Sequence, residues 1–418
     1  MLRIDRACIY IIMLGMTMLI PSIQYTTNID ELCVMLFGAV AVLDCLFNNN
    51  WKRYRLLWIV LLILAFYAVY SLTVVHFNVP RAIALDFIIE LKPFVPFIVI
   101  FAISPDLTES DKKIFKAICL FNCVILSIAF FMGHKAVELL VFHLTYGGTI
   151  IFASTMYYIY CSIDSNGRIP RHDLITALVF LTIGLLCLKA KYYGIYILYL
   201  YFFYLYKPGI LRNFSLKHAI MLTVLVATLL AVSWHKIQYY FISGNSDTFD
   251  PKVIQSFARP VLYVTGLQIM GEFIPFGTGL ASFATAASSQ YYADTYYYYG
   301  IDKVHGLAPN KDFDFICDAF YPSLAQFGII GLILFIYFWR YTYTYIRVLI
   351  RKDPDRYRYP FIIGSLIISF ILIENTSATT FTHCVGFIVM TLFGFVCAKG
   401  KQIKEKDSET SVQIIQKI

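Results

Sequence analysis

One long polar interval, residues 234–321, interrupts the apolar segments of this chain. It begins with WHKIQYYFISGNSDTFDPK at 234–252 and continues with FARPVLYVTGLQIMGEFIPFGTGLASF at 257–283. A tyrosine-rich segment, SSQYYADTYYYYG at 288–300, follows, and HGLAPNKDFDFICDAFYPSLAQFGIIGL at 305–332 leads into the next apolar run. The other polar connections are shorter, so we expect most of the chemically active residues to lie in this interval.

The composition is that of an integral membrane protein. Of the 418 residues, 59% are hydrophobic and 14% are charged, and the mean hydropathy is +0.69, far from the averages of soluble domains. Apolar runs of about 17 to 25 residues have the length that a helix needs to cross a bilayer. The alternating pattern of a membrane barrel is absent. We therefore predict an all-α polytopic membrane protein with about 12 transmembrane helices.

Short polar turns separate the predicted spans. The spans are residues 7–23, 32–47, 56–75, 81–103, 117–132, 149–161, 174–188, 192–206, 219–233, 324–339, 361–373 and 384–397. The first span begins as a secretory signal would, but it lacks a small-residue cleavage site, so we interpret it as a retained helix. The chain then divides into helices one to nine (1–233), the large extracytoplasmic loop (234–321), helices ten to twelve (322–398) and a cytoplasmic tail (399–418).

The distribution of basic residues predicts the orientation, because short cytoplasmic loops are enriched in lysine and arginine. The amino terminus, the even-numbered turns and the tail hold 24 of the 34 lysines and arginines, and the opposite side holds 10. Both termini are therefore predicted to be cytoplasmic and the long interval to be outside. This topology accounts for the net charge of +8, so we expect no nucleic-acid partner.

The ten cysteines do not indicate a disulfide framework. Most lie inside apolar runs, where cysteine behaves as a small hydrophobic residue. Cys317 alone belongs to the long interval, and no activating pattern near it marks a nucleophile.

Arg259, which precedes Pro260, is the most informative basic residue of the interval. An isolated arginine is more often a solvated external charge, but a glycine-rich turn containing Gly277, Gly279 and Ser282 follows it. Glycines allow close backbone approach, and exposed N–H groups at such a turn or at a helix start can hold an anionic oxygen. An arginine fork suits a diphosphate group. These features favour diphosphate binding, although GxG alone is a weak signal.

Asp318 places a carboxylate at the outer mouth of the tenth predicted span. The plain interpretation is an acidic residue favoured by the positive end of a helix dipole. The functional interpretation is a proton acceptor beside the site of Arg259, and the residue taken alone does not decide between the two.

Arg259, the sequence GTGLASF and an acidic residue before FYPSLAQFGIIGL together resemble the extracytoplasmic loop of the O-antigen polymerase and ligase superfamily. The family includes capsule and exopolysaccharide polymerases. The motifs cover residues 259–332, and elsewhere only the topology is similar. The resemblance implies a bacterial inner-membrane glycosyltransferase that uses polyprenyl-diphosphate-linked oligosaccharides as donor and acceptor. It implies no nucleotide donor, cofactor or metal, and it suggests membrane lipid and a chain-length regulator protein as further partners.

The resemblance also assigns roles to individual residues. Arg259 is expected to hold the diphosphate together with Lys189 or Lys191, which stand where the family usually has an arginine. Asp318 is the expected general base, with Glu272 and His305 as reserves. The two lysines fit equally well as snorkelling side chains at the ends of spans.

The branch of the superfamily is indicated by one departure from its pattern. Ligases commonly have a histidine in an HN-like motif near the end of the loop, whereas the corresponding stretch here reads DAFYP. This difference favours a polymerase. A ligase that transfers the finished glycan is the nearest alternative, and a lipid-linked oligosaccharide flippase is a more distant one. A flippase is expected to place its charges between two similar halves, and no internal repeat is visible here.

A second polar set lies in the fourth predicted span. Asp86 and Glu90 are four residues apart and therefore share a helix face, and carboxylates inside a membrane are often functional. We favour a structural network in which they pair with Arg81 or Lys92. For the tyrosines of 291–299, we favour an aromatic belt at the membrane interface over stacking on sugar rings.

Overall fold

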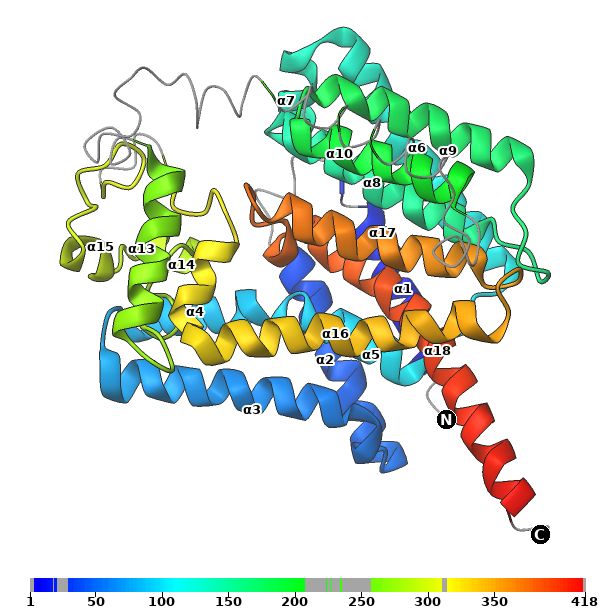
Figure 1. Ribbon diagram of the computed structural model, residues 1–418, viewed down its shortest axis with the longest axis horizontal. Helices are drawn as coiled ribbons and strands as arrows, with labels where there is room; N and C mark the ends of the chain where they lie inside the picture. Colours follow the sequence, from blue (N-terminus) through cyan, green and yellow to red (C-terminus); the bar gives the residue numbers. More distant parts are fainter. Residues whose placement is uncertain are drawn as a thin grey trace.

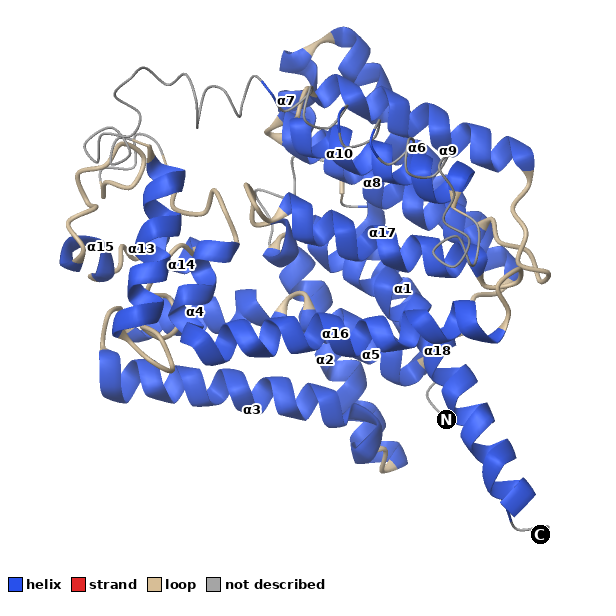
Figure 2. Cartoon of the chain, in the orientation of Figure 1, coloured by secondary structure: helices blue, strands red, loops and turns tan. Residues whose placement is uncertain are grey.

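The computed structural model describes residues 4–17, 19–20, 29–206, 223, 227, 234, 257–309 and 314–415. Every regular element in these ranges is helical, as Figure 2 shows. The predicted all-α class is therefore confirmed for the described chain. The ninth predicted span and the part of the long interval before Phe257, apart from positions 223, 227 and 234, lie outside the described residues, as do residues 310–313.

Several helical segments are long and apolar enough to cross a membrane. Four qualify individually: Trp51–Val75, Glu109–Met132, Tyr321–Lys352 and Cys384–Asp407. A fifth is obtained if α7 (His134–Val141) and α8 (Leu144–Cys161), which are bent by 71° relative to one another, form one broken span. These segments support a membrane protein, whereas the number of twelve spans stays a prediction.

The other helices correspond to the predicted apolar segments, but they begin and end at different residues. They are α1 (Ile4–Thr17), α2 (Ile29–Asn48), η2 (Trp51–Tyr54), α3 (Arg55–Tyr70), η3 (Ser71–Val75), α4 (Pro80–Leu91), α5 (Phe94–Ile103), α6 (Glu109–Met132), α9 (Arg171–Gly184), η4 (Leu185–Cys187), α10 (Ala190–Leu200), η5 (Tyr201–Leu205), α16 (Gly328–Lys352), α17 (Arg358–Glu374) and η8 (Thr380–Thr382). The fourth predicted span is thus two helices, α4 and α5. The break falls at Lys92 and Pro93, because proline lacks the N–H group that would continue α4.

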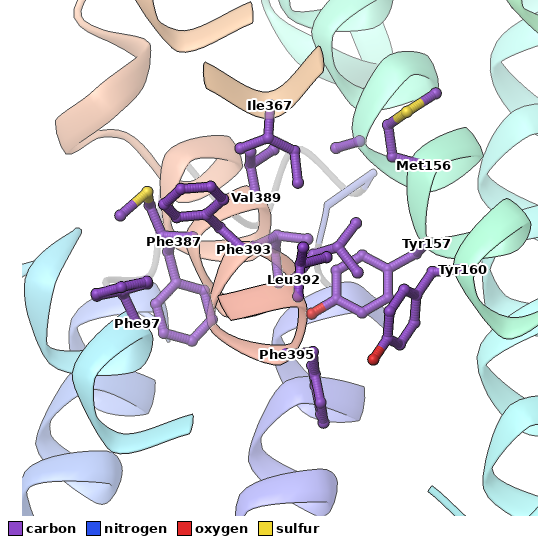
Figure 3. Packing of buried hydrophobic residues seen from close by; sticks show 14 of the residues in the cluster. Phe97, Met156, Tyr157, Tyr160, Ile367, Phe387, Val389, Leu392, Phe393 and Phe395 are labelled. Atoms are coloured by element: carbon purple, nitrogen blue, oxygen red, sulfur yellow. The ribbon is translucent and has the colours of Figure 1, made fainter. Parts of the chain in front are cut away.

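The core is organised around α18 (Cys384–Ile415), which packs against α5, α8 and α16. Its most apolar stretch is 89% buried, which identifies it as the central helix and not a lipid-facing one. Figure 3 shows Phe393 of this helix beside Phe97, and their ring centres are 5.4 Å apart. Tyr157 of α8 points toward α18 from the other side, so α18 lies between α5 and α8.

A small helical lobe, which we call the outer lobe, lies at one end of the bundle (left in Figure 1). It contains α13 (Ala258–Glu272), α14 (Ala286–Gln290) and α15 (Thr295–Tyr298), and it packs on α4 and on η7 (Tyr321–Phe327). Tyr296 is fully buried in its centre, and its hydroxyl accepts a hydrogen bond from the Ala284 N–H at 2.9 Å. The interface-belt prediction is therefore wrong for Tyr296, although Tyr297 and Tyr298 are exposed.

Candidate functional site

The structure brings Arg259 and Asp318 into direct contact. Arg259 is in the first turn of α13, where Pro260 is tolerated because the N–H groups of a first turn have no partner inside the helix. Asp318 lies in the turn before η7, where its own N–H donates to the carbonyl of Phe315 at 3.1 Å. The Nη2 atom of Arg259 forms an ion pair with Oδ2 of Asp318, and each side chain is about one third exposed.

A second ion pair joins α10 to α17. The Nζ atom of Lys191 lies 2.6 Å from Oε1 of Glu374 and also donates to the carbonyl of Ser377 at 3.2 Å. Both charged side chains are largely enclosed, with 12% of Lys191 and 2% of Glu374 exposed. Lys191 is therefore held by protein partners and is not a lysine that extends freely toward lipid headgroups.

The connection that follows Glu374 links the two ion pairs. Its carbonyl groups accept hydrogen bonds from the Tyr263 hydroxyl of α13, at 2.9 Å, and from the N–H of Phe320, at 3.1 Å. The same connection accepts the bond from Lys191. The elements that carry Arg259, Asp318 and Lys191 consequently meet on one segment, residues 374–378.

The electrostatic environment of Asp318 reflects this convergence. Burial raises the pKa of Asp318 above its usual value, and the positive charges of Arg259 and Lys191 oppose that shift without cancelling it. The amino-terminal end of α13 adds a further positive potential near Arg259. A carboxylate with a raised pKa among cations is a stronger proton acceptor than an ordinary surface aspartate.

Arg259 retains an unused hydrogen-bond donor. Its Nε atom is buried and has no hydrogen-bond partner among the described residues. Because a buried donor without a partner is unfavourable, the position of the guanidinium beside Asp318 leaves this N–H group unsatisfied. The guanidinium thus offers a donor beyond its bond to Asp318.

The glycine-rich turn has a structural role that the sequence did not predict. The N–H groups of Gly279 and Leu280 donate to the Gln326 carbonyl, at 2.9 Å, and to the Ser71 hydroxyl, at 2.7 Å. Ser282 is fully buried and bonds to Thr278 at 2.7 Å. The expectation that these N–H groups hold an anionic oxygen is corrected, because protein acceptors already occupy them.

Gly277 provides a direct test of this structural role. Its φ is +73°, and an added Cβ would lie 2.1 Å from the carbonyl oxygen of Ala325. We expect Gly277→Ala to destabilise the fold by about 1–3 kcal/mol or more, because it combines backbone strain with a steric clash. Thermal unfolding of the purified protein in detergent measures the effect. Gly271→Ala is the matched control, since nothing lies within 4 Å of its added Cβ, and equal melting temperatures for the two variants would contradict the assignment.

Asp86 and Glu90 of α4 hold the glycine-rich turn and the adjacent η7 in place. Oδ2 of Asp86 accepts the N–H of Ala281 at 2.8 Å, and Oε1 of Glu90 accepts a bond from the Gln326 amide at 3.2 Å. The predicted pairing with Lys92 is wrong.

Lys92 and Arg81 lie elsewhere. Lys92 forms ion pairs with Asp30 at 2.7 Å and Glu31 at 3.3 Å. Arg81 is exposed, and no ion pair in the described chain joins it to either carboxylate of α4. The charges of the fourth predicted span therefore do not form the single network expected from the sequence.

The other predicted site residues lie around or away from the two ion pairs. Lys189 is next to the first turn of α10, and its charge acts on Glu374. Glu272 is at the far end of α13 from Arg259, about 20 Å along the helix axis, and it accepts a bond from the Tyr299 hydroxyl at 2.7 Å. This distance removes Glu272 as a reserve base. His305 is exposed in the outer lobe, with its ring edge-on to Phe315.

Sequence reasoning missed Glu374 and the connection that follows it. The signal was present, because ENTSATTFT at 374–382 is a polar, lysine-free turn between two apolar spans on the predicted outer side. An acidic residue at that boundary needs a cation from elsewhere in the chain, and Lys191 is that cation.

Comparisons with known proteins give no family assignment. A scan against protein-family models finds none that matches, and a search of curated proteins finds no match either. The functional interpretation of the chain therefore depends on its own residues and on the motif resemblance.

Proposed function

We propose that this chain is a bacterial inner-membrane glycosyltransferase that joins polyprenyl-diphosphate-linked oligosaccharide units at the outer face. The observation that carries the proposal is the convergence of Arg259, Asp318 and Lys191 on one segment, although they come from three separate parts of the sequence. Two cations suit a diphosphate group, and a carboxylate with a raised pKa suits proton removal from a hydroxyl.

An apolar groove beside this site offers a place for the lipid part of the substrate. The cavity has a volume of about 930 Å³ and lies between α3 and α16, which run alongside one another in Figure 1. Glu90 and Phe320 line it toward the outer lobe, and Phe320 follows Asp318 by two residues. Most of the remaining lining is apolar, including Leu64, Leu334 and Phe338. An isoprenoid tail in this groove would leave the diphosphate near Arg259.

The reaction that we assign to the site is a substitution at the anomeric carbon of the donor. A hydroxyl oxygen of the acceptor forms a bond to that carbon, and the bond from the carbon to the diphosphate oxygen breaks. The hydroxyl proton passes to the carboxylate of Asp318. Negative charge grows on the departing diphosphate, where Arg259 and Lys191 stabilise it, while the sugar acquires oxocarbenium character.

The ion pairs suggest how substrate binding prepares the base. Before substrate binds, Asp318 is engaged by Arg259, and Glu374 neutralises Lys191. A diphosphate that attracts Arg259 competes with Asp318 for the guanidinium. Binding of the donor therefore releases the carboxylate that the acceptor hydroxyl requires.

The DAFYP stretch favours a polymerase over a ligase. Analysis of the products distinguishes a polymerase from a ligase and from a flippase. Loss of the regular ladder on a polysaccharide gel after inactivation of the protein indicates a polymerase. Loss of all surface-attached chains, with polymer persisting on the lipid carrier, indicates a ligase. Elongation by the purified protein in detergent, where no membrane has to be crossed, excludes a flippase as the explanation.

The groove yields a prediction of its own. We expect Leu334→Trp to reduce activity about tenfold or more through a higher KM for the lipid-linked donor, because the indole would fill the space proposed for the tail. Ile333→Trp is the control, since Ile333 is the exposed neighbour on the same helix and does not line the groove. Initial rates over a range of donor concentrations measure the effect. Equal KM values for the two variants would place the tail elsewhere.

A further inference from the structure

A second cavity, of about 1000 Å³, lies away from Arg259 and Asp318. Its wall comes from the beginning of α6, the end of α8 with the turn that follows, the connection between α16 and α17, and the middle of α18. The α16–α17 connection is at the opposite end of the bundle from the outer lobe (right in Figure 1). This is the face that the distribution of basic residues predicts to be cytoplasmic.

Basic side chains outnumber carboxylates in the wall of this cavity, by seven lysines and arginines to five aspartates and glutamates. Three of the basic residues are neutralised within the wall. The pairs are Lys112 with Glu109 at 2.8 Å, Lys116 with Asp173 at 2.9 Å, and Lys352 with Asp407 at 2.6 Å. The positive charge that remains is carried by side chains that face the same cavity from different elements.

Lys399 of α18 is the central member of the remaining basic group. It is partly buried, and its Nζ atom lies 4.6 Å from the centre of the Tyr160 ring. No carboxylate of the described chain is within ion-pair distance of Lys399, Lys113 or Arg356. Lys112 and Arg356 repel the ammonium group of Lys399, whereas Asp106, which also lines the cavity, attracts it without forming an ion pair in the described chain. Like charges that converge on a partly enclosed cavity are unfavourable unless an anion lies between them.

We propose that this cavity binds a phosphate group through Lys399, Lys113 and Arg356. The planar fork of an arginine matches phosphate oxygens, and lysines add point charges. Basic pockets between helices at the cytoplasmic face bind the phosphate of anionic lipid headgroups, and a soluble phosphate compound presents the same chemistry. The cavity is of the size of small-molecule sites, about 300–1,000 Å³. This site is separate from the proposed glycosyl-transfer site and does not depend on it.

The test measures binding to the full chain purified in detergent. One arm titrates short-chain phosphatidylglycerol against phosphatidylcholine of the same chain length and follows bound lipid by native mass spectrometry. The other arm titrates inorganic pyrophosphate at constant ionic strength and follows the melting temperature. Preferential binding of phosphatidylglycerol identifies a lipid headgroup as the source of the phosphate, whereas stabilisation by pyrophosphate alone identifies a soluble compound. Because pyrophosphate also resembles the diphosphate proposed at Arg259, its titration is made on the Arg259→Ala variant, and either result then supports the site.

Variants then locate the bound phosphate. Lys399→Gln and Lys113→Gln are each expected to weaken binding about tenfold, as the loss of one charge-assisted contact does, and Lys399→Arg is expected to retain it. Arg351→Gln is the matched control, because Arg351 is exposed in the last turn of α16, close to the connection that carries Arg356, and does not line the cavity. Because Lys113 is exposed, we expect Lys113→Gln to fold, and this variant tests the phosphate site if Lys399→Gln does not fold. The proposal is overturned if neither probe binds, or if the Lys113 and Arg351 variants bind equally well.

Discussion

Replacing Arg259 with alanine is expected to slow glycosyl transfer about 100- to 1,000-fold, which is the usual effect of removing one donor from a site that stabilises developing negative charge. Arg259 is expected to contact the diphosphate, and its buried Nε donor has no partner among the described residues. Arg259→Lys should recover part of the rate, because it restores the charge but not the fork. Chain lengths on a polysaccharide gel and initial rates with purified enzyme both measure the effect.

A matched control separates this effect from a general loss of the outer lobe. Lys303 is an exposed cation in the same lobe, so Lys303→Ala should leave chain lengths unchanged. Normal chain lengths in the Arg259→Ala strain, at an unchanged protein level, would remove Arg259 from the site.

Asp318→Asn is expected to reduce the rate about 100- to 10,000-fold, the range for loss of a general base. In the wild-type protein the rate should rise with pH as Asp318 ionises, because only the carboxylate accepts a proton. Burial raises the pKa of Asp318, so this rise should be centred above the ordinary aspartate value of about 3.9. The residual rate of the Asp318→Asn variant should not rise with pH over this range. An unchanged pH profile in the variant would assign the base to another group.

The Asp318→Asn substitution also removes the ion-pair partner of Arg259. Asparagine cannot form the ion pair that Asp318 makes, so we expect Arg259 to bind the donor more tightly in this variant. A lower rate combined with an unchanged or smaller KM for the donor therefore fits the loss of a base. A higher KM with an unchanged turnover rate would instead show that Asp318 organises donor binding.

The class of fold and the importance of Arg259 and Asp318 could be predicted from the sequence. Long apolar runs predict helices because a lipid-exposed backbone must satisfy its hydrogen bonds internally. Arg259 and Asp318 could be selected because charged residues are rare in this chain and these two flank recognisable motifs. Their contact could not be derived, since the partners are 59 residues apart and the loop between them contains no regular periodicity.

The errors have physical reasons as well. A glycine-rich turn indicates close backbone approach, but the sequence does not say whether a ligand or the protein makes that approach, and here Ala325 does. Similarly, Lys92 is close in sequence to Glu90, yet its side chain pairs with Asp30 of the neighbouring helix α2. Glu374 was overlooked because a single acidic residue at the end of an apolar run is common, and only the tertiary structure reveals Lys191 beside it.

The central claim is that the site containing Arg259, Asp318 and Lys191 transfers glycans from a polyprenyl diphosphate. Its most direct test is to incubate the purified chain in detergent with lipid-linked oligosaccharide units and to determine product masses over time. The account predicts products that increase by whole repeat units with wild-type protein and with Lys303→Ala, and none above background with Arg259→Ala or Asp318→Asn. Absence of elongation by the folded wild-type protein, or equal elongation by all four proteins, would contradict it.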